Sequence, residues 1–259
     1  MEFIPSDTGE IELTGESVEI GSGPAALPMM LYKPPQAGPR PCLLVCPGGT
    51  GQGLFEIAEW LCSRARAAGY VVLTLSWRDA SPKDDPDDIS AAITWLQKQP
   101  FVDVGRTALF GGSRGANAAL RCAALDARVK AVVTLGALTD PLQLAVGAAA
   151  FAPSRYDLLK AWLGDPVRDR LFYERISAIS HADRIRCPVL MIHGSHDFHC
   201  PIEQSIMMYE KMVACGNRQA ELIKLPFMGH YGDVVPNGYA FNYLSSLILP
   251  FVDRRTGPT

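Results

Sequence analysis

The chain has 259 residues, of which 48% are hydrophobic and 20% are charged, values typical of a globular protein rather than a disordered or fibrous one. Its formal net charge is -3, so no basic field favours nucleic acid or an anionic lipid surface as a partner. The length fits a single α/β domain over residues 1–259, since no linker or internal repeat divides the sequence.

The sequence also indicates a cellular compartment. The N-terminal run MEFIPSDTGEIELTGE is acidic, whereas a secretory signal starts with positive charge and continues into an apolar core. The longest weakly polar stretch, Leu142 to Pro153, is shorter than the ~20 residues that cross a bilayer. The seven cysteines are an odd number and most lie in apolar runs, which favours reduced, packed thiols. We expect a cytoplasmic protein without a membrane span.

The predicted elements begin with three short strands near Ser17–Ile20, Met29–Tyr32 and Cys42–Cys46. Strand-like and helix-like periodicities then alternate to the end of the chain. Helices are expected near 54–68, 88–99, 114–125, 202–215 and 239–252, and strands near 70–76, 107–112, 129–137, 188–194 and 221–226. This pattern predicts a mostly parallel eight-stranded sheet with helices on both faces. Sheets of this type carry their functional residues at the carboxyl ends of the strands.

Two segments between these elements need separate interpretation. Residues 141–180 are longer than a crossover helix requires, and Leu158, Leu159 and Trp162 recur at helical spacing. We expect this insertion either to form a small helical cap or to cover the sheet. The charged run SPKDDPDD, residues 81–88, is interpreted as a solvated loop that ends in an aspartate N-cap.

The strongest chemical signal is the sequence from Gly111 to Gly115, GGSRG, between the strand TALF and the helix ANAALRCAAL. A serine on such a tight strand-to-helix turn is exposed above the sheet, and glycines are needed where a Cβ would clash. This context predicts Ser113 as a nucleophile, with an ordinary glycine-rich turn as the alternative.

A serine hydroxyl is a weak nucleophile, so it needs a neighbouring base, and the base needs a group that fixes its tautomer. Asp197 follows the strand PVLMI and His230 follows the strand ELIKLP, so both lie beyond strand carboxyl ends. The chain order Ser, Asp, His is that of the α/β-hydrolase fold. We predict Asp197 as the orienting acid and His230 as the general base. Glu203 and Asp233 are nearby acids that compete for the same role.

An acyl-transfer site also needs N–H donors for the oxyanion. One is expected from the backbone of Arg114, and a second from Gly49 or Thr50 in the loop PGGTG. This loop lacks the GK[ST] ending of a phosphate loop. Trp77, at a strand end, and Phe198, beside the predicted acid, are candidate substrate-binding residues, with plain packing as the alternative for the tryptophan.

A cluster of metal ligands is the competing interpretation of the segment around Asp197. His193, His196, His199 and Cys200 lie close together in the sequence. Their spacing of about three in a strand-to-loop segment does not bring them to one ion as two histidines at i and i+4 of a helix do. We therefore expect neither a metal nor another cofactor.

The elbow GGSRG, the run ISHADRIRCPVLMIHGSHDFHCPIEQS and the closing LPFMGHYG are similar to the catalytic domain of the prolyl oligopeptidase family and its dienelactone-hydrolase-like relatives. The resemblance covers roughly Leu31 to Val252 and implies an α/β-hydrolase fold. It also implies that Ser113, Asp197 and His230 form the triad.

The sequence departs from that family at two places. Family peptidases usually have His-Gly-Gly in the oxyanion loop and Gly-Gly after the neighbour of the nucleophile, whereas this chain has Pro47-Gly48-Gly49 and Gly115-Ala116. The propeller of the oligopeptidases also has no counterpart in the sequence, so ester cleavage is favoured over peptide cleavage.

We therefore expect a serine hydrolase that cleaves a small or medium carboxylic ester through an acyl-enzyme intermediate. A peptidase or amidase of the prolyl oligopeptidase type is the alternative. A non-catalytic binding protein is disfavoured because all three triad candidates are present. The expected partner is a small ester or a short peptide, and self-association is left open.

Overall fold

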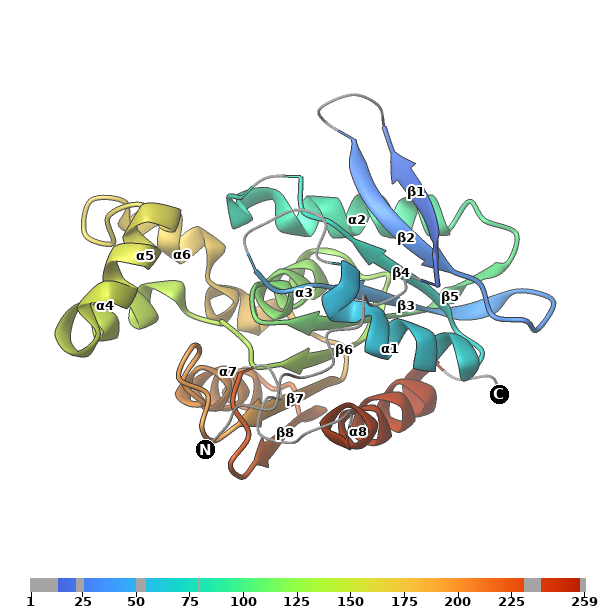
Figure 1. Ribbon diagram of the computed structural model, residues 1–259. Helices are drawn as coiled ribbons and strands as arrows, with labels where there is room; N and C mark the ends of the chain where they lie inside the picture. Colours follow the sequence, from blue (N-terminus) through green and yellow to red (C-terminus); the bar gives the residue numbers. More distant parts are fainter. Residues whose placement is uncertain (1–13, 22–25, 50–54, 79, 231–238, 257–259) are drawn as a thin grey trace, which may run out of the picture.

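The computed structural model describes residues 14–21, 26–49, 55–78, 80–230 and 239–256. In them, eight strands form one sheet in the order β1-β2-β4-β3-β5-β6-β7-β8 (Figure 1). β1 and β2 pair antiparallel, β2 and β4 also pair antiparallel, and every other neighbouring pair is parallel. The strands are β1 Glu16–Ile20, β2 Leu27–Tyr32, β3 Arg40–Cys46, β4 Val71–Leu75, β5 Val102–Gly112, β6 Val129–Leu135, β7 Val189–Gly194 and β8 Ala220–Leu225. The predicted eight-stranded, mostly parallel sheet is confirmed.

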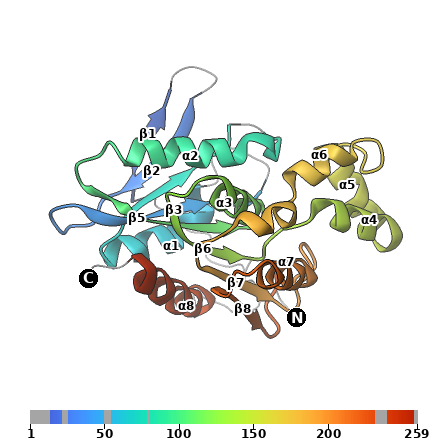
Figure 2. The ribbon, with the colours of Figure 1, turned by 180° about the vertical axis from the view of Figure 1, so that it is seen from behind.

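The central strands are buried on both faces, which explains why their sequences are continuously apolar rather than alternating. In β3, Cys42 and Leu44 belong to one core, and Leu43 and Val45 belong to the other. Figures 1 and 2 show the two helical layers that complete these cores. The first layer contains α2 Asp85–Leu96, α3 Arg114–Leu125, η3 Ala178–Arg184 and α7 Glu203–Ala214, and the second contains α1 Phe55–Ala67 and α8 Tyr239–Thr256.

The insertion after β6 folds as three helices beside the sheet, at the side where the strands carry their carboxyl ends (Figure 1). These are α4 Pro141–Phe151, α5 Pro153–Leu163 and α6 Arg170–Ile176. They share a separate apolar cluster that includes Leu144, Leu159 and Tyr173. Leu138 and Cys200, from two loops at the edge of the sheet, are buried in the same cluster, so the insertion packs directly on those loops.

The run SPKDDPDD is not a solvated loop, so that interpretation was wrong. It folds as the short helix η2 Pro82–Asp84 followed directly by α2, and Asp84 at the N-cap makes no side-chain capping bond. Asp85 and Asp88 are buried. Their charges are matched by Arg114 and Arg78, which the linear sequence does not place beside them.

The sequence predicted packed, reduced cysteines and no membrane-spanning helix. All seven cysteines are free thiols and five are buried, which agrees with the prediction of packed thiols. Among the helices that the structure describes, none has the length and apolar character needed to cross a membrane.

Candidate active site

Ser113 lies on the turn between β5 and α3, at the carboxyl edge of the sheet. Its φ of 52° and ψ of -115° fall in a region that residues with a side chain rarely occupy. The flanking glycines permit this turn, because a Cβ at Gly111 would lie 2.3 Å from the carbonyl oxygen of Gly115. A Cβ at Gly115 would lie 2.0 Å from the carbonyl oxygen of Cys46. The local geometry is that of a nucleophile elbow.

Asp197 and His230 form a hydrogen-bonded pair beyond the ends of β7 and β8. His230 Nδ1 lies 2.7 Å from Asp197 Oδ2, and both side chains are almost completely buried. The other carboxylate oxygen accepts the backbone N–H groups of His199 at 2.9 Å and Cys200 at 2.7 Å. Burial raises the pKa of Asp197, but hydrogen bonds from His193, His230 and the backbone of Cys200 outweigh it and hold that pKa well below its usual range. Asp197 is therefore ionised and fixes the proton of His230 on Nδ1.

His193 supports this carboxylate from the buried end of β7, a role that the sequence did not reveal. Its Nε2 lies 2.7 Å from the carbonyl oxygen of Cys200 and 3.2 Å from Asp197 Oδ2. Both partners accept hydrogen bonds, so Nε2 carries a proton, and Nδ1 lies 2.7 Å from the Ser205 hydroxyl. His193 therefore holds the Asp197 carboxylate in a fixed orientation, as the hydrogen-bond partner of a metal ligand orients that ligand.

The end of β6 brings the elbow and the Asp197–His230 pair to one place. The backbone N–H of Ser113 donates to the carbonyl oxygen of Leu135 at 3.0 Å. At the next residue, Gly136, φ is +56°, and a Cβ there would lie 3.1 Å from both Asp197 Oδ2 and His230 Nδ1. The three triad candidates therefore surround the Leu135–Gly136 peptide, and Gly136 is a site residue that sequence reasoning missed.

Cys200 is a second missed residue, because its thiol is close enough to the Ser113 side chain for that side chain to lower the pKa of the thiol. Burial raises the pKa of this thiol to about 12, and the negative charge of Asp197 acts in the same direction. At neutral pH the thiol is therefore protonated. It is a neutral neighbour of the serine rather than a competing nucleophile.

The glycine-rich loop after β3 packs against the elbow. A Cβ at Gly48 would lie 3.1 Å from the Cβ of Ser113, and Gly49 has a φ of +80°. Thr50, the other predicted donor, lies outside the described residues. Trp77 is only 1% exposed, so it does not line a substrate pocket, and its burial supports the alternative of plain packing. Its indole N–H donates to the carbonyl oxygen of Pro47 at 3.1 Å, so it supports the loop from below.

The side chain of Arg114 points away from the triad candidates, into the interface between α2 and the insertion. Its Nε and Nη2 donate to the two carboxylate oxygens of Asp85 at 2.8 and 2.7 Å. The guanidinium carbon lies 5.0 Å from the ring centre of Trp77 and 6.0 Å from that of Trp162 on α5. Only the backbone of Arg114 is thus placed for the predicted oxyanion role.

An exposed aromatic group borders the Asp197 loop. Phe198 is 83% exposed and Phe227 is 69% exposed. The ring of His196 lies between them, 6.5 Å from the first and 5.4 Å from the second. Phe227 has a φ of +61°, and its N–H donates to Ser195 Oγ at 3.0 Å. Phe198 therefore lies on an open rim rather than in an enclosed pocket.

The sequence also offered two alternative acids and a cluster of metal ligands as site residues. Glu203, the first residue of α7, is exposed, and Asp233 lies outside the described residues. Across the described ranges, histidine, cysteine, aspartate and glutamate side chains form no three-ligand group for a metal.

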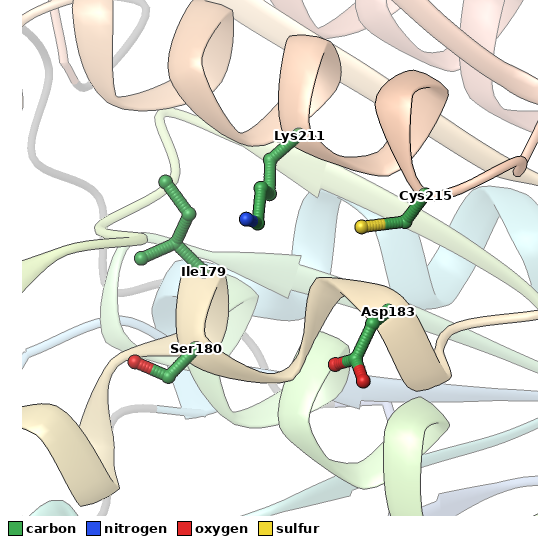
Figure 3. A pocket seen from close by; sticks show the side chains of 5 residues that line it. All are labelled: Ile179, Ser180, Asp183, Lys211 and Cys215. Carbon is green, nitrogen blue, oxygen red and sulfur yellow. The ribbon is translucent and has the colours of Figure 1, made fainter.

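A hollow of about 610 Å³ lies elsewhere, between η3 and the last turns of α7 (Figure 3). Lys211 enters it from α7, Cys215 from the residue directly after that helix, and Asp183 from η3. This end of α7 leads into the amino end of β8, whereas Asp197 precedes the start of α7. The hollow is thus at the opposite end of the sheet from the triad candidates.

Comparison with solved structures places this arrangement in a known class. Pyrococcus horikoshii acylaminoacyl peptidase matches 95% of this chain over 42% of its own, with a TM-score of 0.80 and 17% identity. Est1E from Butyrivibrio proteoclasticus matches 95% of this chain over its full length, with a TM-score of 0.74 and 18% identity. The fold is that of the α/β-hydrolases.

The sequence comparisons narrow the class to a family. The model of the prolyl oligopeptidase family matches residues 73–258, so the chain belongs to that family. It is 28% identical to esterase LipC of Mycobacterium tuberculosis over 226 residues, 76% of this chain and 54% of that protein. It is 29% identical to esterase FrsA of an Enterobacter species, over 81% of this chain and 53% of that protein. The chain spans about half the length of these curated relatives.

Proposed function

We propose that this chain hydrolyses carboxylic esters, with Ser113 as nucleophile, His230 as general base and Asp197 as the acid that orients the base. The observation that carries the proposal is the 2.7 Å contact between His230 Nδ1 and an ionised Asp197, beside a serine in elbow geometry. Since Asp197 engages Nδ1, Nε2 is the nitrogen left to accept a proton from the serine hydroxyl.

In the first half-reaction, Ser113 Oγ attacks the ester carbonyl carbon while its proton passes to His230 Nε2. The tetrahedral oxyanion is stabilised by backbone N–H groups, of which that of Arg114 is placed at the start of α3. The loop containing Gly49 packs on the elbow and supplies the second candidate donor. The intermediate then expels the alkoxide, which takes the proton from His230 and leaves as the alcohol.

In the second half-reaction, water attacks the acyl-enzyme and gives a proton to His230 Nε2. The new tetrahedral intermediate expels Ser113 Oγ, which recovers that proton, and the carboxylic acid is released. Asp197 remains ionised throughout because its hydrogen bonds hold its pKa well below the usual range. It stabilises the imidazolium that forms in each half-reaction.

Amide cleavage is the second candidate activity, since the chain belongs to a family named for oligopeptidases and resembles an acylaminoacyl peptidase in fold. Ester cleavage is favoured because esterase-named relatives match over most of this chain. The loop sequence Pro47-Gly48-Gly49 also replaces the His-Gly-Gly of family peptidases. Parallel assays with p-nitrophenyl esters and aminoacyl p-nitroanilides separate the two activities.

We also propose that α4, α5 and α6 act as a cap over the site. Trp162 on α5 donates from its indole nitrogen to the carbonyl oxygen of Ala80 at 2.6 Å and lies over Arg114. Thr139, at the start of the insertion, is held by Gln204 of α7 through bonds of 2.6 and 3.0 Å. The insertion is thus attached to the Arg114 side chain on one side and to the start of α7 on the other.

A fluorophosphonate probe tests the assignment of the nucleophile, because it reacts with activated serines. We expect the probe to label the native protein at Ser113, and Ser113→Ala to remove both labelling and ester turnover. Ser180→Ala, at an exposed serine on η3, is the matched control and should retain both. Labelling that persists in Ser113→Ala would show that another residue is the nucleophile. A labelled protein with no turnover of any ester or anilide would identify a binding protein instead.

A further inference from the structure

Arg155 on α5 reaches from the insertion to the loop that carries Asp197. Its Nη2 donates to the carbonyl oxygen of His199, and its Nη1 lies 3.4 Å from His199 Nδ1. The His199 ring lies against the His230 ring, with the two centres 5.2 Å apart. The guanidinium is thus one side chain removed from the candidate base.

The same guanidinium lies beside the backbone that holds the candidate acid. The carbonyl oxygen that accepts from Arg155 belongs to the peptide group between His199 and Cys200. The N–H of that peptide group donates to Asp197 Oδ1 at 2.7 Å. Arg155 therefore places a positive charge next to the loop that binds Asp197.

No carboxylate of the described residues forms an ion pair with Arg155, although it adjoins the site. Its Nε is shielded from solvent and has no hydrogen-bond partner. Two other arginines of the insertion differ, because Arg168 pairs with Asp169 and Arg170 pairs with Glu174. A shielded N–H without an acceptor is costly, and it needs an explanation.

We propose that Arg155 binds a carboxylate at the far end of the substrate's acyl chain. This inference rests on the proposed mechanism at Ser113 and names its substrate class, an ester whose acyl part is acidic, such as a half-ester of a dicarboxylic acid. A guanidinium has five N–H donors, of which the contacts with His199 use only some, and a charge-assisted hydrogen bond to a carboxylate is strongest where water is partly excluded. Because the acyl part stays attached to Ser113 through both half-reactions, one anion-binding group positions it in each.

The test compares two esters that share one acyl chain. Mono-4-nitrophenyl adipate carries the free carboxylate, and its methyl ester is the neutral counterpart. We expect native protein to have the higher kcat/KM on the half-ester, and Arg155→Gln to lower the ratio of the two kcat/KM values about tenfold or more. Arg155→Lys should recover part of the preference. The ratio does not depend on the fraction of folded enzyme, so partial misfolding does not obscure the result.

Arg170→Gln is the matched control, because Arg170 is an exposed arginine of the same insertion, paired on its surface with Glu174. It should leave the ratio unchanged. Calorimetric titration of Ser113→Ala protein with monomethyl adipate adds a readout without turnover, and binding should weaken when Arg155→Gln is introduced into that variant. An unaltered ratio together with unaltered binding in Arg155→Gln would overturn the proposal. Failure of the proposed mechanism would show separately, because the fluorophosphonate probe would then not label the native protein at Ser113.

Discussion

Removing the carboxylate of Asp85 should destabilise the protein more than removing any exposed acid. Asp85 and Arg114 form a two-bond ion pair in which the side chains are 3% and 2% exposed. Burial raises the pKa of Asp85 even though Arg114 opposes that shift. Because the folded-state pKa of Asp85 is raised, the stability that its protonated form contributes below the unfolded-state pKa is lost as the pH rises through the folded-state pKa. The intact ion pair therefore adds little net stability. Asp85→Ala, however, leaves a buried guanidinium without its counter-charge, which costs about 3–5 kcal/mol.

Urea denaturation of Asp85→Ala measures this cost, and Glu16→Ala is the matched control. Glu16 pairs with Lys33 at 2.8 Å, but both side chains are about half exposed, so its removal should cost less than about 1 kcal/mol. The double variant Asp85→Leu/Arg114→Met removes both charges and should recover much of the lost stability. Equal losses in Asp85→Ala and Glu16→Ala would refute the reasoning. A double variant as unstable as Asp85→Ala would show that packing, not charge, is responsible.

Three further predictions concern the site. Asp197→Asn should lower ester turnover roughly a thousand-fold, because His230 loses its orienting acceptor. The melting temperatures of this variant and the native protein should differ above about pH 4 and converge as the pH falls below it. The folded-state pKa of Asp197 is depressed, so the stability that its ionised carboxylate contributes is present above the unfolded-state pKa and is lost as the pH falls through the folded-state value. Gly115→Ala should abolish stable folding in a denaturation assay because its Cβ would overlap the Cys46 carbonyl, whereas Gly112→Ala, with nothing within 4 Å, should be nearly neutral. Trp162→Ala should move the preferred p-nitrophenyl ester to longer acyl chains while fluorophosphonate labelling persists, and an unchanged chain-length profile would mean that α5 does not limit the acyl group.

The parts that the sequence predicted best depend on local chemistry. Continuous apolar runs separated by helical periodicity are sufficient to predict the parallel sheet, because strands buried on both faces have no polar side. The elbow is equally local, since a Cβ at Gly111 or Gly115 would meet backbone atoms of the turn or of the adjacent strand. Asp197 and His230 could be proposed because each follows a strand of the parallel sheet, and parallel strands end at the same edge.

The parts that the sequence missed depend on pairing between distant segments. Asp85 looks like a solvated charge in SPKDDPDD, and its partner Arg114 lies on another helix. His193 is read as a strand residue until β7 is placed against the loop at Cys200. Gly136 has no motif of its own, and only the approach of His230 shows why a side chain is excluded there. Such roles follow from tertiary contacts that periodicity does not encode.

The insertion connects these long-range contacts to the proposed chemistry through one face of one helix. Arg155 and Trp162 are seven residues apart on α5, which is two helical turns, so they lie on the same face. At one end of that face Arg155 contacts His199 beside the candidate base, and at the other Trp162 covers the Arg114 side chain directly after the nucleophile. A shift of α5 would therefore move the proposed carboxylate-binding group and the packing on Arg114 together. We therefore expect the proposed substrate selection by the insertion and the packing on Arg114 to be coupled, and variants of either residue should be assayed for both.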